Sequence, residues 1–260
     1  MAVKKKLNRT LKPKSPLSSV QTIQLDWPAF TDQLLPKSSL SPETLLPSQI
    51  IVIRNFWTEN LCKNYVHYLK TLPLVTTGGK LKKGDAIRFN DRFQINDANF
   101  AHRLWTETRL KELICDIGTD ETMTAHDRNK LWGGEVIGLN PSIRIYRYGK
   151  GQFFDKHYDE SNMVSLKTDT AITTSANTTW TFLLYLTSAS TGCEGGETVF
   201  YPNVDLKKGI RDLALEKLVV KLETGMLLLH KHGKDCILHE GKEVLGGEKW
   251  VIRTDLCVKR

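Results

Sequence analysis

The chain has 260 residues, of which 40% are hydrophobic and 25% charged, so it is long enough to bury a core and has the composition of an ordinary soluble globular protein. No apolar run reaches the roughly 18 residues of a membrane span, and the N-terminus lacks the apolar stretch of a secretory signal, which argues against a membrane partner and against export. Five cysteines without a CxxC pair argue against a disulfide framework and a zinc finger, and favour a protein of the cytoplasm, the nucleus or both.

The net charge of +8 comes mainly from the N-terminus, where residues 1–14 hold six positive charges and no acid. We expect residues 1–20 to form a disordered basic tail. A solvated flexible terminus, a nuclear address and a weak nucleic-acid contact all agree with such a tail. The net charge therefore says little about the substrate.

The segment 21–132 is predicted to be a mixed α/β support region. Apolar runs and alternation predict strands, and an apolar stripe at helical spacing after the N-cap candidate Thr58 predicts a helix. In chain order we expect a strand over 48–56, a helix over 59–72, a strand over 86–95 and a helix over 97–115.

Polar side chains are unusually frequent in the second of these strands. Arg88, Asn90, Asp91 and Arg92 lie close together in GDAIRFNDRFQIND. We predict that Arg88, Asn90 and Arg92 form part of a substrate entrance. A solvated edge strand explains the same pattern.

From about residue 133 the chain changes to short strands separated by turn residues, with little helical pattern. We expect strands over 142–149, 178–188, 218–222, 225–230 and 249–258. This spacing is typical of a sandwich or a small barrel, so 133–260 is predicted to be an all-β core.

Three residues of this region have the pattern of a metal site. His157 and Asp159 stand two apart in GKGQFFDKHYDESN, and such positions point to the same side of a strand. His239 follows 80 residues after Asp159, in CILHEGKEV. Two histidines and one carboxylate on a rigid β scaffold match the facial triad of non-haem Fe(II) oxygenases. Each half of this pattern alone is a weak signal.

Three motifs in order strengthen the interpretation, and together they lie within residues 138–258. They are YGKGQFFDKHYD, GGETVFYP at 195–202, and HEGKEVLGGEKW, in which the basic Lys249 follows His239 by ten positions. The set resembles the prolyl 4-hydroxylase-like 2-oxoglutarate- and Fe(II)-dependent dioxygenases. The resemblance implies an α+β, mainly β fold: a double-stranded β-helix (jelly-roll) core over 133–260 with supporting helices from the N-terminal half. It also implies Fe(2+), 2-oxoglutarate and O2 as cofactors, with ascorbate as a further one.

The same resemblance assigns roles to residues. His157, Asp159 and His239 are expected to hold the iron, and Lys249 to bind the distal carboxylate of 2-oxoglutarate. Arg253 competes for the second role, because period two puts Lys249, Val251 and Arg253 on one face of their strand and Trp250 and Ile252 on the other. Motif spacing favours Lys249, whereas bidentate geometry toward carboxylates favours Arg253. The cation that does not bind the co-substrate needs an acidic partner or the substrate.

Several further residues are candidates for the pocket. Tyr185 matches a position at which related hydroxylases place a tyrosine hydroxyl on the same carboxylate, and Tyr148 and Thr198 are expected to line the cavity. Ordinary core roles explain these three as well. His230 and His232 form an HxH unit of the kind used by cupins, but no suitably spaced glutamate follows, so we interpret them as loop histidines.

The resemblance implies hydroxylation of a C–H bond, most closely that of a protein side chain such as proline, with release of succinate and CO2. Oxidative demethylation of alkylated nucleic acid is a rival function, although the paired-arginine signature of those demethylases is not reproduced in KWVIRTDLCVKR. Two further functions agree with the same fold: a small-molecule oxygenase, and a degenerate, non-enzymatic jelly-roll binding module. The partner is thus an unidentified protein or small molecule, and the oligomeric state is not predicted.

Overall fold

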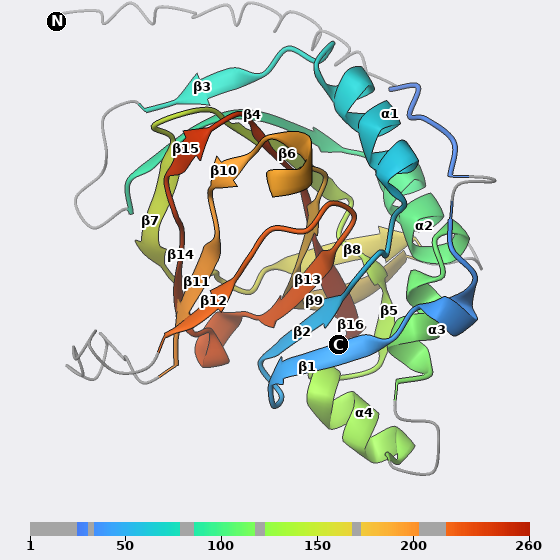
Figure 1. The fold of residues 1–260 in the computed structure, drawn as a ribbon. Coiled ribbons are helices and arrows are strands. Elements are labelled where there is room, and N and C mark those ends of the chain that lie inside the picture. The colour runs from blue at the N-terminus through green and yellow to red at the C-terminus, as the bar shows by residue number, and fades with distance from the viewer. Residues whose placement is uncertain (1–24, 31–33, 79–85, 118–122, 168–172, 203–216) are drawn as a thin grey trace, which may run out of the picture.

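In the computed structural model, antiparallel strands wind into a barrel, and the helices gather along one side of it (Figure 1). The structure describes residues 25–30, 34–78, 86–117, 123–167, 173–202 and 217–260, so the predicted tail of residues 1–20 lies outside the described residues. The helices are α1 (Glu59–Leu69), α2 (Ala98–Glu107), α3 (Leu110–Cys115) and α4 (Ala125–Trp132), with short 3-10 turns η1 (Lys37–Ser39), η2 (Ala189–Thr191) and η4 (Gly233–Asp235).

Most of the strands are short, as the spacing of turn residues predicts, but two of those described, Thr173–Tyr185 and Lys249–Lys259, have 13 and 11 residues. In chain order they are β1 (Pro42–Leu46), β2 (Ile50–Ile53), β3 (Val75–Thr77), β4 (Arg88–Asn96), β5 (Val136–Leu139), β6 (Ser142–Tyr148), β7 (Phe153–His157), β8 (Met163–Lys167), β9 (Thr173–Tyr185), β10 (Glu194–Gly195), β11 (Thr198–Tyr201), β12 (Leu218–Val220), β13 (Leu227–Lys231), β14 (Leu238–Gly241), β15 (Val244–Gly246) and β16 (Lys249–Lys259).

Hydrogen-bonded neighbours follow the order β1-β2-β13-β9-β16-β6-β4-β7-β14-β11-β12. The path turns at β4, which pairs with β6 through residues 91–96 and with β7 through residues 88–89. The longer arm of the path, up to β4, forms one wall of the barrel, and β7, β14, β11 and β12 form the other. This arrangement is a jelly roll, so the predicted fold class is confirmed.

Strands from the N-terminal half complete the barrel. β2 pairs with β13, and β4 has partners on both sides, so the interpretation of β4 as a solvated edge strand is wrong. The sequence pattern showed the alternation of this strand, but not that β3, β6 and β7 would cover both of its edges. The division of the chain at residue 133 stays a prediction.

The helix predicted over 97–115 is in fact two helices. Arg109 has a left-handed backbone (φ 65°), which ends α2 and starts α3 in a new direction. The Thr108 hydroxyl donates a hydrogen bond to the carbonyl of Leu104 and closes the last turn of α2. The break allows Leu110, the first residue of α3, to reach the core, where it is fully buried.

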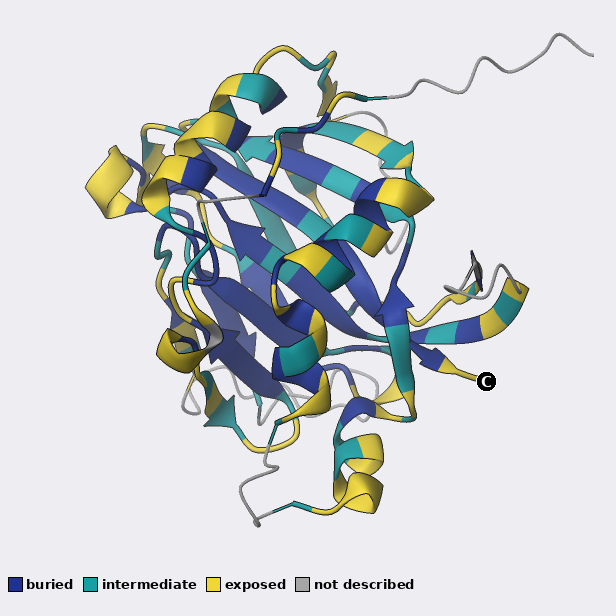
Figure 2. Cartoon of the chain, turned by 90° about the vertical axis from the view of Figure 1, so that its right-hand side faces the viewer, coloured by how far each residue is buried: buried dark blue, intermediate teal, exposed yellow. Residues whose placement is uncertain are grey.

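The two faces of the central strands serve different purposes. On β16, Trp250 and Ile252 face the large core that is shared with α1, α2 and α3, while Val251 belongs to the cluster inside the barrel. Lys249 and Arg253 line the cavity with Val251, so the predicted alternation along this strand is confirmed. Figure 2 shows the result: the strands are mostly buried, and the helices keep exposed outer faces.

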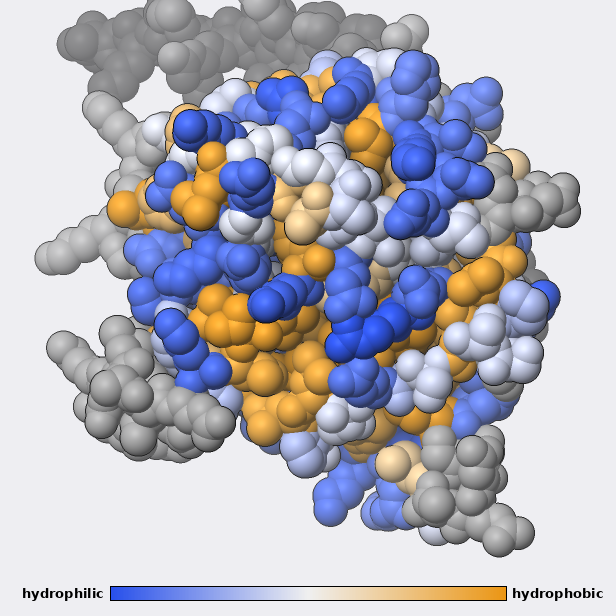
Figure 3. Space-filling view, in the orientation of Figure 1, coloured by the Kyte–Doolittle hydropathy of each residue, from blue (hydrophilic) through white to orange (hydrophobic). Residues whose placement is uncertain are grey.

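The surface is mixed in character. Figure 3, in the orientation of Figure 1, shows apolar side chains gathered where β11 and β12 lie, next to hydrophilic side chains on the same face. Among the residues that the structure describes, no helix combines the length and the apolar character needed to cross a membrane.

Candidate iron and 2-oxoglutarate site

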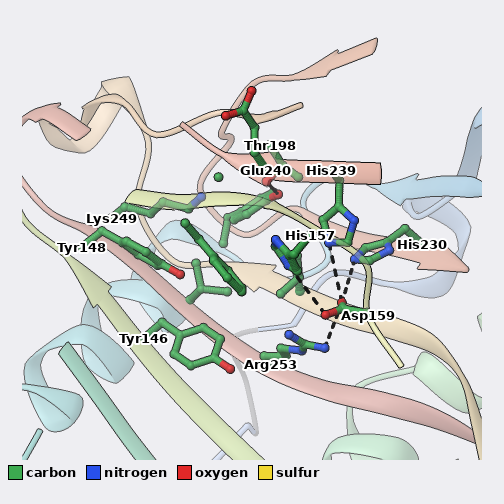
Figure 4. A pocket seen from close by; sticks show the side chains of 15 residues that line it. Tyr146, Tyr148, His157, Asp159, Thr198, His230, His239, Glu240, Lys249 and Arg253 are labelled. Carbon is green, nitrogen blue, oxygen red and sulfur yellow. Dashed lines mark hydrogen bonds and ion pairs between the residues drawn. The ribbon is translucent and has the colours of Figure 1, made fainter. Parts of the chain in front are cut away.

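A pocket inside the barrel brings together all eight residues that the sequence assigned to iron or 2-oxoglutarate. Its walls come from β6, β7, β9, β11, β13, β14 and β16 (Figure 4). The lining residues are Tyr146, Tyr148, Phe154, His157, Asp159, Leu183, Tyr185, Thr198, His230, His239, Glu240, Gly241, Lys249, Val251 and Arg253.

His157, Asp159 and His239 form a compact cluster. β7 and β14 are paired so that His157 and His239 are direct partners across the two strands, and their ring centroids are 4.2 Å apart. The Nε2 atoms of His157 and His239 each lie 3.7 Å from a carboxylate oxygen of Asp159. One ligand atom from each residue fits within 4.8 Å of the others, which is close enough for a single metal ion.

Both histidine rings are oriented by backbone carbonyls. Nδ1 of His157 lies 2.8 Å from the carbonyl of Asp155, and Nδ1 of His239 lies 2.9 Å from that of Ile237. Because a carbonyl only accepts, Nδ1 of each ring carries the hydrogen, and the lone pair of Nε2 faces Asp159. Burial lowers the pKa of His157 to about 3 and also lowers the pKa of His239, so both rings are neutral at pH 7. A neutral imidazole is the form that binds a metal.

Asp159 is buried and ionised. Burial alone would raise the pKa of its carboxyl, but the Arg253 guanidinium outweighs that effect and holds the pKa well below its usual value. Nη2 of Arg253 and the hydroxyl of Thr181 each donate to Oδ2 of Asp159 at 2.9 Å. Of the two cations that face the pocket from this strand, Lys249 and Arg253, it is therefore Arg253 that has an acidic partner.

Lys249 is buried at the end of the pocket away from Asp159 (Figure 4). Its Nζ donates to the carbonyl of Gly196 at 2.6 Å and lies 5.4 Å from the ring centroids of Tyr148 and Tyr185. Within the described ranges no carboxylate lies within ion-pair distance of this ammonium. Burial lowers the pKa of Lys249 to about 8, against smaller opposite effects of Cys193 and Glu197. The hydroxyls of Tyr185 and Thr198, 2.6 Å apart, add hydrogen-bonding groups to this pocket.

Gly196 provides the space for the lysine. Its backbone is left-handed (φ +75°), and a Cβ on this residue would come within 3.2 Å of Cδ of Lys249 and within 3.0 Å of Cγ2 of Val244. Only glycine adopts this conformation without strain. The second glycine of the GGETVF motif thus allows both the turn and the approach of the Lys249 side chain.

His230 is a pocket residue that the sequence interpretation missed. It does not lie in a loop but in β13, between β2 and β9, and it is buried. Its Nε2 lies 3.6 Å from Oδ2 of Asp159, and its ring centroid 4.5 Å from that of His239. The alternation in GMLLLHK, with Leu228 and His230 on one face, was the signal that could have found it.

His232 does lie in a loop, just before η4, as predicted, but it is not at the surface. It is buried, and its Nδ1 lies 2.9 Å from the Thr181 hydroxyl, while its Nε2 lies 2.9 Å from the Thr178 hydroxyl. Since the Thr181 hydroxyl donates to Asp159, it accepts from His232. His232 therefore positions the residue that holds the carboxylate.

The three predicted entrance residues differ in their surroundings: the two arginines lie beside the pocket, and the asparagine is buried. The Arg88 guanidinium lies 5.7 Å from the ring centroid of Tyr146 and 5.1 Å from that of Phe154, and Arg92 lies 6.0 Å from Tyr146, so both contact rings that line the pocket. Asn90 is fully buried, and its Oδ1 accepts a hydrogen bond from Thr77. The role of these three residues in substrate entry stays a prediction.

Comparison with known families agrees with this geometry. The profile of the 2OG-Fe(II) oxygenase superfamily matches residues 143–254, which include the triad and both cations. This segment, which makes up less than half of the chain, matches the 2OG-Fe(II) oxygenase superfamily. With this match the chain is a 2-oxoglutarate-dependent dioxygenase, and the family implies Fe(II), 2-oxoglutarate and dioxygen as cofactors. The degenerate, non-enzymatic binding module stays an untested alternative. Ascorbate stays a prediction.

Solved structures of three prolyl hydroxylases are similar to this chain. The viral collagen prolyl hydroxylase of Paramecium Bursaria Chlorella virus-1, in its 2-oxoglutarate complex, is 15% identical, with 81% of this chain and 96% of that chain covered and a TM-score of 0.49. A prolyl hydroxylase of Trichoplax adhaerens, in complex with a hypoxia inducible factor peptide fragment, is 17% identical over 81% and 84%, with a TM-score of 0.48. A prolyl-4-hydroxylase of Pseudomonas putida is 14% identical over 85% and 94%, with a TM-score of 0.47. A search of curated proteins found no match to the sequence.

Proposed function

We propose that this oxygenase holds Fe(II) with His157, Asp159 and His239, binds 2-oxoglutarate with Lys249, and hydroxylates a C–H bond of a protein side chain, with proline as the first candidate. The observation that carries the proposal is the buried Lys249 ammonium, which has no acidic partner in the described chain and shares a pocket with the His/Asp/His cluster. Burial of a cation without a partner is unfavourable in free energy, and a carboxylate of the co-substrate would supply the missing partner.

The donor atoms fit ferrous iron. Two neutral imidazole nitrogens and one ionised carboxylate oxygen, gathered on one side, are the ligand set of non-haem Fe(II) oxygenases. When bound, iron supplies the activation of dioxygen, of which one oxygen atom ends in succinate and the other in the new hydroxyl group, while the lost carboxyl leaves as CO2. Arg253 and Thr181 both bond Oδ2 of Asp159, which leaves Oδ1 available to the metal.

The other end of the pocket fits a carboxylate. Lys249 supplies a positive charge, and the paired hydroxyls of Tyr185 and Thr198 supply the one O–H donor that their mutual hydrogen bond does not use. Val251 and Leu183 line the same pocket, and their apolar side chains would help to keep water from the ion pair. A salt bridge is stronger in such an environment than in water, so a small number of groups is enough to orient the co-substrate.

The proposal of proline as substrate rests on the three sequence motifs, which resemble those of prolyl 4-hydroxylase-like enzymes. Arg88 and Arg92 lie beside the pocket-lining ring of Tyr146, which supports their proposed contact with a bound substrate. The acceptor is an isolated C–H group, so the protein's task toward it is to position the carbon and to keep water out.

The first experiment is anaerobic. Addition of Fe(II) and 2-oxoglutarate to metal-free protein is expected to give the visible charge-transfer band of the chelate, and Asp159→Ala should lose the band while it keeps the fold. Under air, proline-containing peptides are then tested for release of succinate and for a mass gain of one oxygen. Absence of the band in folded protein contradicts the proposed site. A band with turnover only on methylated nucleic acid or on small molecules contradicts the proposed substrate.

A further inference from the structure

A second set of metal-ligating side chains overlaps the first. His230, Cys236 and His239 each offer one ligand atom, and these atoms lie within 4.8 Å of one another. They come from β13, from the residue that follows η4, and from β14, so one β13–β14 connection supplies all three. The two sets share His239 and differ in their other members.

His230 is the observation that points to a ligand. It is 2% exposed, and neither of its ring nitrogens has a hydrogen-bond partner in the part of the chain that the structure describes. Its 3.6 Å separation from Oδ2 of Asp159 is too long for a hydrogen bond, and that oxygen already accepts from Arg253 and Thr181. A buried imidazole without a partner is unfavourable, and a metal ion would use its free lone pair.

Cys236 brings a different chemistry to this position. Its Sγ accepts a hydrogen bond from the backbone N–H of Asp159 at 3.2 Å, so the thiol lies directly behind the carboxylate ligand. Sulfur is a soft ligand, which favours zinc over cations such as magnesium that prefer oxygen ligands. A given site also generally binds Zn²⁺ more tightly than Fe²⁺. Two imidazoles and one thiolate are a normal protein ligand set for zinc, with a fourth position left to water.

We propose that His230, Cys236 and His239 form a zinc site that excludes iron from the neighbouring triad. On binding, the thiol of Cys236 gives its proton to solvent and its sulfur ligates the ion, and His239 turns from the iron set to the zinc set. The zinc site stands on its own three residues, whereas its competition with iron rests on the proposed function. Zinc then keeps the enzyme inactive without any change in the concentration of 2-oxoglutarate.

Cobalt(II) is the probe, because it replaces zinc and gives a near-ultraviolet thiolate-to-metal band when sulfur ligates it. Metal-free full-length protein is titrated with Co²⁺ under nitrogen, without 2-oxoglutarate. We expect the thiolate band in wild type and in His157→Ala, and its loss in Cys236→Ser and in His230→Phe. Cys115→Ser, at an exposed cysteine, is the matched control and should keep the band. In competition with a chelator, Cys236→Ser should weaken Zn²⁺ binding at least on the order of 100-fold, since loss of even an outer partner of a ligand costs up to about 100-fold.

The Fe(II)–2-oxoglutarate band should respond to the same variants in the opposite way, so it separates the zinc-site proposal from the proposed iron site. It is expected to survive in Cys236→Ser and to vanish in His157→Ala, and prior addition of one equivalent of Zn²⁺ should suppress it in wild type more than in Cys236→Ser. A cobalt complex without a thiolate band, or with one that survives in Cys236→Ser, overturns the zinc site and leaves the iron site untouched. If the variants do not fold, X-ray absorption of the wild-type zinc protein decides: a sulfur neighbour at about 2.3 Å supports the site, and only nitrogen and oxygen neighbours overturn it.

Discussion

Lys249 and Arg253 project from the same face of β16 into one pocket, but of the two only Arg253 has a carboxylate partner among the described residues. Arg253 donates to Asp159 at 2.9 Å, whereas Lys249 donates only to the carbonyl of Gly196. The two cations therefore have separate tasks. Arg253 stabilises the carboxylate of the metal cluster, and Lys249 keeps its charge for a ligand that the protein itself does not supply.

Replacement of Lys249 tests this division. Lys249→Met keeps most of the length of the side chain and removes the charge, so we expect the Kd of 2-oxoglutarate to rise about 10- to 100-fold, which corresponds to a charged hydrogen bond of ~1.5–3 kcal/mol. The affinity for the metal without co-substrate should not change. Anaerobic titration of the Fe(II)–2-oxoglutarate band measures the first quantity, and titration with Mn²⁺ the second. Unchanged co-substrate affinity in Lys249→Met, with a loss in an Arg253 variant, would reverse the two roles.

The binding of 2-oxoglutarate should also depend on pH through Lys249. Its pKa is lowered to about 8 by burial, and a bound carboxylate would raise it again, so the free enzyme must take up a proton on binding above pH 8. The Kd is expected to be constant below pH 8 and to rise by up to about tenfold for each pH unit above it. Isothermal titration with Mn²⁺-loaded protein from pH 6.5 to 9.5 measures the effect. Lys249→Arg is the control, because a guanidinium stays protonated and its profile should be flat.

Lys249 also makes the free energy of unfolding depend on pH. As the pH rises, this contribution increases, whereas the affinity for 2-oxoglutarate falls. In the unfolded chain its pKa returns to about 10.4, so between pH 8 and that value the unfolded state binds more protons than the native state. The contribution of Lys249 to the free energy of unfolding therefore rises with pH in this range, as the cost of a buried charge disappears. Above pH 8 the free protein gains stability from this residue while it loses affinity for the co-substrate.

The sequence was sufficient for those parts of the site that depend on local spacing. The His157–Asp159 pair, the basic residue ten positions after His239 and the alternation along β16 are all properties of short segments, in which period two gives shared faces. The break between α2 and α3 was not predictable in this way, because Arg109 takes a left-handed conformation without a glycine or proline to mark it.

Long-range pairings were the other part that the sequence could not show. Whether Arg253 or Lys249 would meet an acid depends on how β16 lies relative to Asp159, which follows β7. The inward position of His230 depends on the insertion of β13 between β2 and β9. Asn90 was predicted at the entrance from its polarity alone, and its burial against Thr77 follows from the pairing of β3 with β4.

Loss of Arg253 should weaken metal binding and the fold together. In Arg253→Leu the buried Asp159 carboxylate loses its closest cation, and breaking a buried pair from one side typically costs about 3–5 kcal/mol of unfolding free energy. Because outer partners of metal ligands contribute about 10- to 100-fold, the Kd for Fe(II) or Mn²⁺ should rise by that factor. Thr181→Val removes the second donor to Oδ2 and should give a smaller change of the same sign.

Denaturant unfolding of the metal-free proteins and metal titration measure both quantities. Excess Mn²⁺ should recover part of the lost stability of Arg253→Leu, because the ion replaces the missing positive charge beside Asp159. If Arg253→Leu binds metal as tightly as wild type and loses only co-substrate affinity, Arg253 binds 2-oxoglutarate and the assignment to Asp159 is wrong.

Gly196→Ala tests whether the backbone around Lys249 is built for the co-substrate. The added Cβ would meet Cδ of Lys249 at 3.2 Å and Cγ2 of Val244 at 3.0 Å, and the left-handed backbone adds strain of about 1 kcal/mol or more. We expect the ammonium to move from its carbonyl partner and the Kd of 2-oxoglutarate to rise several-fold, with no change in the Kd of Mn²⁺. Gly151→Ala is the matched control, since Gly151 has a similar backbone angle (φ +83°) with no atom within 4 Å of an added Cβ, so it should lose stability without loss of co-substrate affinity. Equal effects of the two variants on 2-oxoglutarate binding would show that strain alone, and not contact with Lys249, is responsible.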